Sequence, residues 1–230
     1  MIGAYEWRKA GVPIAALGGR KIHPHYGVFS PIRGEYIDLL VRSPMPPALS
    51  NCPLAFDLGV GTGVLTALLL QRGVPRVIGT DLSPRAIDCA DDNLRRLGLR
   101  EQVELLCTDQ YPSSQAALVV CNPPWLPGQP GSLLDQAIYD PDCAMLRSFL
   151  SGLAQHLCPG GEGWLVLSDL AERLGLRPRE QLMAWIEHGG LRVVSRLDTR
   201  PGHRKSQDSK DPLHRARAAE VTSLWRLAKR

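Results

Sequence analysis

The residues with the clearest chemical potential are the tetrad Asn122-Pro123-Pro124-Trp125, which follows the apolar run 118–121. The Asn122 side-chain oxygen and the Pro123 backbone carbonyl can each accept an N–H, and proline fixes φ, so this carbonyl is aimed in advance. Trp125 offers a flat face on which an amide or a base can stack. Such a tetrad can orient a planar nitrogen and favour the positive charge that develops as the nitrogen attacks an electrophile. No general base or metal is needed, because the nitrogen becomes acidic only after it has reacted.

A glycine-rich turn, Asp57-Leu58-Gly59-Val60-Gly61-Thr62-Gly63, ends an earlier apolar run. Glycines let the backbone turn sharply and let a ligand approach without a Cβ in the way. The spacing differs from the GxGxxG dinucleotide fingerprint, and alone it also fits a tight strand-to-helix loop. Two further apolar runs end in acids, Asp81 and Asp109, and a carboxylate at the second strand end can accept hydrogen bonds from both ribose hydroxyls. Because ligands of open α/β sheets bind at the carboxyl ends of the strands, these residues together predict a nucleoside cofactor.

Alternating strand-like and helix-like runs predict an α/β fold with a doubly wound, seven-stranded, mostly parallel sheet. The strands are expected at residues 54–58, 76–79, 103–107, 118–121, 164–167, 191–197 and 221–227. Helices are expected at 64–71, 84–97, 145–157 and 178–188, with Ser83 capping the second and Pro159-Gly160-Gly161 ending the third. The loop before the last strand is too short for a usual crossover helix, so that strand should be antiparallel to the sixth. Residues 1–50, with one short helix-like run, are interpreted as an N-terminal lid or substrate-side segment preceding one domain at 51–230.

The glycine turn resembles motif I of class I S-adenosylmethionine-dependent methyltransferases, and the tetrad resembles the (N/D)PP(Y/F/W) motif of amino-methyltransferases. The segments 27–40 and 81–86 are similar to segments of the HemK/PrmC-type glutamine methyltransferases, in the small-domain group. The resemblance extends over roughly residues 27–168. The sequence departs from that family by Ile32, inserted between Pro31 and Arg33, and by Trp125 in place of the usual Tyr. About fifty residues before motif I are also too few for the family's N-terminal helical domain.

The resemblance implies that S-adenosylmethionine is the cofactor and that Asp109 lies against the adenine amino group. It also implies that Phe29 and Glu35 belong to a lid over the cofactor. The expected cofactor-binding residues are Asp57, Gly59, Gly61, Gly63, Asp81, Asp109 and Asn122. The expected catalytic residues are Asn122, Pro123, Pro124 and Trp125.

Composition and charge indicate the compartment and the partners of the protein. The chain has 230 residues, a formal net charge of +4 and six dispersed cysteines without a CxxC pair, which indicates a cytoplasmic protein without a bound metal. No apolar run reaches the roughly 20 residues needed to cross a membrane. The segment 199–219 holds six Lys and Arg residues against two Asp, a net +4 that equals the charge of the whole chain. This basic loop is either a solvated connection or a clamp for phosphates or an acidic protein surface.

The sequence therefore predicts an S-adenosylmethionine-dependent N-methyltransferase that acts on a planar nitrogen of a macromolecule. The upstream segment favours a protein glutamine as the methyl acceptor. The alternative is an amino group of an RNA or DNA base, of the adenine N6 type. A small-molecule methyltransferase and a non-catalytic domain that only binds the cofactor are further alternatives.

Overall fold

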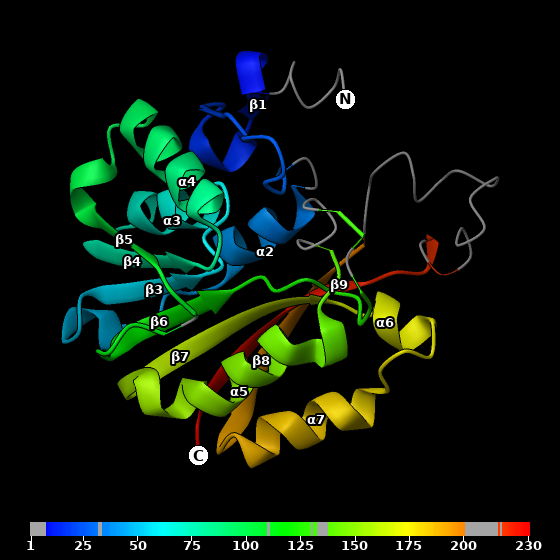
Figure 1. Ribbon diagram of the computed structural model, residues 1–230. Helices are drawn as coiled ribbons and strands as arrows, with labels where there is room; N and C mark the ends of the chain where they lie inside the picture. The colour runs from blue at the N-terminus through cyan, green and yellow to red at the C-terminus, as the bar shows by residue number, and fades with distance from the viewer. Residues whose placement is uncertain are drawn as a thin grey trace.

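The computed structural model describes residues 8–31, 34–109, 111–129, 131–132, 138–200, 216 and 218–230. Its centre is a seven-stranded sheet with the strand order β5-β4-β3-β6-β7-β9-β8 (Figure 1). The strands are β3 (Leu54–Leu58), β4 (Arg76–Asp81), β5 (Val103–Cys107), β6 (Ala116–Cys121), β7 (Leu157–Ser168), β8 (Leu191–Thr199) and β9 (Thr222–Lys229). All seven coincide with predicted strands, with several longer than expected.

The strand directions confirm the predicted topology. The strands β3 to β7 pair in parallel, whereas β9 pairs antiparallel with β7 on one side and with β8 on the other. The last strand is thus inserted between the fifth and sixth strands of this sheet, and β8 runs parallel to β7. The strands β3, β4, β5 and β6 therefore end at one edge, here called the carboxyl edge, where β7 and β8 also end.

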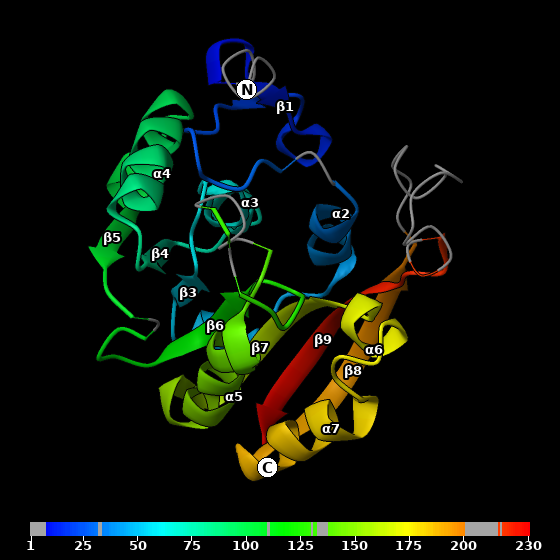
Figure 2. The ribbon, with the colours of Figure 1, turned by 45° about the vertical axis from the view of Figure 1, so that its right-hand side comes forward.

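Helices cover both faces of the sheet. On one face lie α2 (Glu35–Arg42), α3 (Val64–Gln71) and α4 (Pro84–Arg96), and on the other lie α5 (Ala144–His156) and α7 (Arg179–His188), with the short α6 (Leu170–Arg173) beside them (Figures 1 and 2). The strand residues alternate between the two hydrophobic clusters: Leu118 and Val120 face the first, and Val119 and Cys121 the second. This period of two is what a strand buried on both faces requires.

The helix α4 shows how local signals set the ends of an element. Ser83 has an extended backbone and its side chain accepts the N–H of Ala86 at 3.4 Å, while Pro84 occupies the first helical position. Proline suits that position because its missing N–H would have had no partner in the helix. Gly98, with φ +68°, follows the helix and lets the chain turn away. The predicted Ser83 cap is confirmed, and Pro84 and Gly98 mark the two ends of the helix.

The span predicted for the third helix is confirmed, but the prediction of what ends it was wrong. The helix α5 stops at His156, and β7 begins at Leu157, so Pro159-Gly160-Gly161 lies inside the strand instead of ending the helix. The ladder with β6 jumps from Ala116↔Leu157 to Leu118↔Glu162. A bulge of this kind accommodates proline, because the residues in it need not donate to the ladder.

The N-terminal segment packs into the core. The small strands β1 (Val12–Pro13) and β2 (Lys21–Ile22) pair antiparallel, and Leu17, Ile22 and Leu39 are buried in the same cluster as α3. This packing makes the segment part of the helical layer on one face of the sheet. Its role as a lid stays a prediction.

Candidate active site

The β3–α3 turn has the backbone of a ligand-binding loop. Gly59, Gly61 and Gly63 have φ values of +77°, +51° and +77°, a region that L-residues rarely adopt. The amides of Gly59 and Val60 both donate to the Thr80 carbonyl, at 2.9 and 2.8 Å, which ties the turn to the end of β4. A Cβ placed at Gly61 would meet no atom closer than the Gly59 oxygen at 3.8 Å. The space above Gly61 is therefore open, whereas a Cβ at Gly63 would lie 3.3 Å from Ala90 in α4.

Asp81 connects the ends of three strands. Its Oδ2 accepts the amide of Gly61 at 3.1 Å, and its Oδ1 accepts the amide of Ser83 at 2.9 Å. Its backbone carbonyl accepts the amide of Thr108 at 3.1 Å, which brings the end of β5 alongside. Burial raises the pKa of Asp81, opposed by the two amides. Each carboxylate oxygen still has a lone pair for a ligand hydroxyl.

The acid expected at the end of β5 lies near this group. Asp109 is exposed two residues beyond β5. Leu82 directly follows Asp81, and its exposed fraction of 69% is the largest among the exposed large hydrophobic residues of the described chain. An apolar side chain held in water beside a nucleoside site is suited to contact a base. Leu82 was not among the predicted site residues, although its place directly after Asp81 was a usable signal.

Asp57 contacts the start of α3. It is buried, and its Oδ2 accepts both the amide of Thr66 at 2.9 Å and the Thr66 hydroxyl at 2.6 Å. Burial raises the pKa of Asp57 to about 7, partly offset by the Thr66 hydrogen bonds and increased further by the charge of Asp81. The hydrogen bonds of Asp57 thus hold the first turn of α3, the helix that follows the glycine turn, and its contact with the cofactor stays a prediction.

This buried carboxyl predicts a pH-dependent stability. In the unfolded chain Asp57 loses its proton near pH 4, but in the folded chain near pH 7, so the folded state binds the extra proton between these values. Stability should therefore fall as pH rises from about 4 to 7, by at most about 1.4 kcal/mol per pH unit from this group. In Asp57→Asn this component should disappear, so urea unfolding across pH 4–8 should give the variant a flatter profile than wild type. The exposed Asp88→Asn should keep the wild-type profile. An unchanged slope in Asp57→Asn would refute the assignment.

The tetrad lies at the end of β6, beside the glycine turn. In the sheet register Leu58 is paired with Cys121 on one side and with Thr80 on the other. Asn122 and Gly59, the residues that follow Cys121 and Leu58, are therefore neighbours at the carboxyl edge. The sheet brings together the residues that the sequence predicted for the cofactor and for the reacting nitrogen.

Within the tetrad, the Trp125 indole Nε1 donates to the Asn122 Oδ1 at 3.0 Å. Pro123 is buried, whereas the other three residues are half-buried. The following chain is held by Leu126, whose amide donates to the Ile138 carbonyl at 3.1 Å and whose carbonyl accepts the Asp140 amide at 2.8 Å. The Asn122 Oδ1 and the Trp125 ring were both predicted to bind a substrate, but the hydrogen bond between them was not predicted.

The N-terminal segment reaches this site through α2. Tyr36 is buried, and burial together with the charges of Asp57 and Glu35 raises the pKa of its phenol. Glu35, predicted as a lid residue, has a buried Oε1 that finds no hydrogen-bond partner among the residues that the structure describes. Phe29, the other predicted lid residue, is half-buried. Tyr36 was missed by the sequence analysis, because its closeness to Asp57 depends on tertiary packing.

The basic loop 199–219 lies mostly outside the described residues, but its anchors are described. Thr199 ends β8 and pairs with Thr222 of β9, which pairs in turn with Ser168. Both ends of the loop are therefore fixed near the carboxyl edge. Within the described ranges, no helix is long and apolar enough to cross a membrane. The same ranges hold no group of three or more His, Cys, Asp or Glu side chains arranged for a metal ion.

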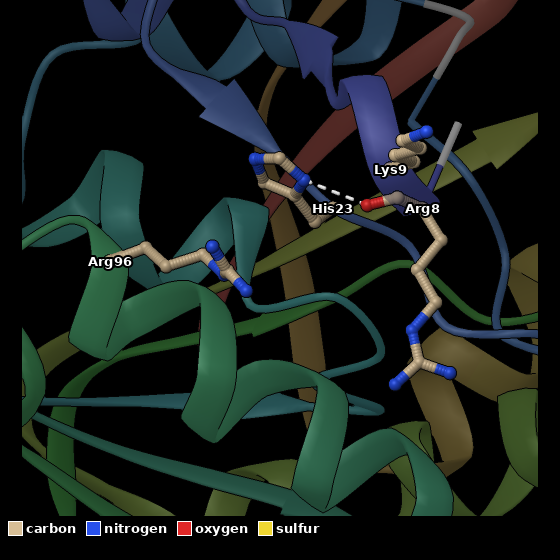
Figure 3. Close-up of a pocket in the computed structure, with 4 residues that line it drawn as sticks. All are labelled: Arg8, Lys9, His23 and Arg96. Atoms are coloured by element: carbon tan, nitrogen blue, oxygen red, sulfur yellow. Dashed lines mark hydrogen bonds between the residues drawn. The ribbon is translucent and has the colours of Figure 1, made fainter. Parts of the chain in front are cut away.

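A separate pocket of about 290 Å³ is lined by basic side chains from the N-terminal segment and α4. The His23 Nδ1 lies 2.8 Å from the Arg8 carbonyl. In Figure 3 Arg96 lies to the left of His23, the Arg8 side chain extends to the lower right and Lys9 lies at the upper right. None of these four side chains has an ion-pair partner among the residues that the structure describes. Arg96 ends α4, so the pocket is at the far end of that helix from Asp81.

Comparison with known proteins identifies this arrangement. The fold resembles that of the N-methyltransferase NodS from Bradyrhizobium japonicum WM9, solved with S-adenosyl-L-homocysteine, with a TM-score of 0.52 and 18% identity over 85% of this chain and 86% of that one. Fold and site together define a class I S-adenosylmethionine-dependent methyltransferase. The sequence model of the family "Methyltransferase small domain" matches residues 20–175, and the chain belongs to that family.

Two curated enzymes are similar to this chain in sequence. The release factor glutamine methyltransferase of Bordetella pertussis is 31% identical over 83% of this chain and 75% of its own length. The ribosomal protein L11 methyltransferase of Tolumonas auensis is 33% identical over 51% of this chain, and the match spans 41% of that enzyme. The predicted family, cofactor and enzyme class are thus confirmed.

Proposed function

We propose that this enzyme methylates a planar nitrogen of a macromolecule, with the side-chain amide of a protein glutamine as its acceptor. The observation that carries the proposal is the pairing of Leu58 with Cys121, which makes the Asn122 carboxamide a neighbour of the glycine turn. A methyl donor bound at the glycine turn and a substrate nitrogen hydrogen-bonded to the Asn122 carboxamide would be within reach of each other, as direct methyl transfer requires.

The charges at the turn fit S-adenosylmethionine. Asp57 and Asp81 have raised pKa values, mainly because they are buried. Within the described chain no Lys or Arg is hydrogen-bonded or ion-paired to either carboxylate. A ligand that carries a sulfonium and an ammonium would supply the missing positive charge, whereas the pyrophosphate of a dinucleotide would be repelled.

Each residue has a definite role in this scheme. Asp81 would accept the ribose hydroxyls, Leu82 would contact the adenine and Asp109 its amino group. S-adenosylmethionine, when bound, supplies an electrophilic methyl group on sulfur. The Asn122 Oδ1 and the Pro123 carbonyl would accept the two N–H groups of the acceptor, which orients its nitrogen and stabilises the positive charge as it grows.

A protein acceptor is supported by the names of both curated relatives, which refer to a release factor and a ribosomal protein. Glutamine is supported by the relative that matches the larger share of both chains. The basic loop 199–219, anchored beside the carboxyl edge, would contact an acidic surface of that protein. Such a contact would be strongest at low ionic strength.

The test is to incubate the enzyme with methyl-tritiated S-adenosylmethionine and an extract, and then to treat portions with protease or nuclease. The label should be released by protease and resist nuclease, and enzymatic digestion of the labelled protein should yield N5-methylglutamine. Label on another residue would refute glutamine and keep a protein acceptor. Label that passes a dialysis membrane without digestion would point to a small molecule and refute a macromolecular acceptor.

The second candidate acceptor is an amino group of an RNA or DNA base, and the pocket in Figure 3 favours it. Its lining of Arg8, Lys9, His23 and Arg96 includes no carboxylate, which suits a phosphodiester backbone. In the same experiment this candidate predicts label released by nuclease. It also predicts that Arg8→Gln with Arg96→Gln weakens nucleic-acid binding and flattens its salt dependence.

A further inference from the structure

Trp125 donates its indole N–H to the oxygen atom that the proposed function assigns to the acceptor nitrogen. The Nε1–Oδ1 distance to Asn122 is 3.0 Å, within the normal range of a hydrogen bond. The body of the ring packs against the hydrophobic clusters on both faces of the sheet. The ring is therefore held by apolar neighbours, while its one polar atom is used within the tetrad.

The chemistry of the two groups makes this contact directional. A carboxamide has an accepting oxygen and a donating NH₂ of similar shape, and a half-turn about its last side-chain bond exchanges them. The indole N–H can only donate, so it binds the oxygen and opposes the flipped state, in which two donors would face each other. In the flipped state the Asn122 NH₂ would face the substrate nitrogen, which also carries hydrogen atoms.

The same contact limits what Asn122 can bind. An amide oxygen has two lone pairs, and one is used by Trp125. The remaining lone pair can accept one N–H, so the second N–H of a primary amide or amine would go to the Pro123 carbonyl. The two prolines between Asn122 and Trp125 have restricted φ, which keeps the spacing of the pair nearly constant.

We infer that Trp125 is a positioning residue, whose indole N–H holds the Asn122 oxygen toward the reacting nitrogen. The inference rests on the proposed function, because only a nitrogen acceptor needs this oxygen to face it. It goes beyond the stacking role expected from the sequence, since a ring without the N–H would stack but would not hold Asn122.

The test replaces Trp125 by β-(3-benzothienyl)alanine, which keeps the two-ring shape and has sulfur where the N–H was. The turnover number kcat should fall about 2- to 10-fold, the effect of one lost neutral hydrogen bond, while the S-adenosylmethionine Kd stays the same. Trp125→Phe, which loses the N–H and part of the stacking face, should lose more activity and is the second variant if the first folds poorly. Equal kcat in wild type and the benzothienyl variant would overturn the inference.

A double-mutant cycle separates positioning from stacking. If the N–H acts through Asn122, the benzothienyl replacement should have no further effect in an Asn122→Ala background. If the two replacements instead lower kcat by independent factors that multiply, the ring acts without Asn122 and the inference is overturned.

A spectroscopic readout completes the test without any need for activity. The indole N–H resonance of Trp125, assigned by its loss in Trp125→Phe, should shift in Asn122→Ala while those of Trp164, Trp185 and Trp225 stay in place. An unmoved Trp125 resonance would overturn the inference.

If wild type transfers methyl to no nitrogen acceptor, the proposed function fails whatever the spectrum shows. If wild type is active and the benzothienyl variant equals it, only the present inference fails.

Discussion

Asn122→Ala is expected to lower turnover by roughly a hundredfold or more, because removal of one oriented polar group from a site of developing charge has an effect of this size. The Kd for S-adenosylmethionine should stay within a few-fold of wild type. The reason for the difference is that the Asn122 oxygen would bind the nitrogen most strongly as the nitrogen becomes positive, which lowers the barrier more than it strengthens ground-state binding. Single-turnover transfer of labelled methyl, together with calorimetry of cofactor binding, would measure both quantities.

The matched control is Asn51→Ala. Asn51 is exposed and precedes β3, at the edge of the sheet opposite the tetrad, so its loss should change neither quantity. Thermal unfolding of both variants would show whether the loss of the hydrogen bond to Trp125 weakens the fold. If folded Asn122→Ala turns over the true acceptor at the wild-type rate, the tetrad does not hold the reacting nitrogen.

Much of this site was predictable because its signals are local. The glycine turn, the acids at the ends of β4 and β5, and the Ser83 cap all depend on a few neighbouring residues. Parallel strands meet at one edge, so the expected strand ends place the tetrad at the same edge as the glycine turn. The structure confirms that placement through the pairing of Leu58 with Cys121.

The features that the sequence analysis missed depend on contacts between distant residues. The charge of Asp57 contributes to the raised pKa of Tyr36 although twenty-one positions separate the two residues, and no local pattern predicts that they lie close together. Pro159-Gly160-Gly161 was interpreted as a helix end on local propensity, but the flanking residues Leu157 and Glu162 pair with β6, which places the three residues in a bulge of β7. The bond between Trp125 and Asn122 depends on rotamers that apolar packing selects.

Asp81→Ala should weaken S-adenosylmethionine binding about 10- to 150-fold, because each hydrogen bond to a charged group contributes roughly 1.5–3 kcal/mol. The structure indicates the upper part of this range. Besides any ribose hydroxyls, Asp81 also holds the amides of Gly61 and Ser83, at 3.1 and 2.9 Å, so the glycine turn loses an anchor as well. Calorimetry on wild type and variant would measure the change. Asp88→Ala, which removes an exposed carboxylate from α4, should bind like wild type.

A ligand analogue separates the two contributions of Asp81. Wild type should bind 2′-deoxy-S-adenosylhomocysteine more weakly than S-adenosylhomocysteine, because one partner of the carboxylate is missing. In Asp81→Ala the two ligands should bind almost equally, since the group that distinguishes them is gone. If the variant still discriminates as wild type does, Asp81 anchors only the glycine turn and another residue binds the ribose. An unchanged Kd for S-adenosylmethionine in Asp81→Ala, or tight binding of NAD by wild type, would show that the cofactor is not held at the end of β4 in the way proposed.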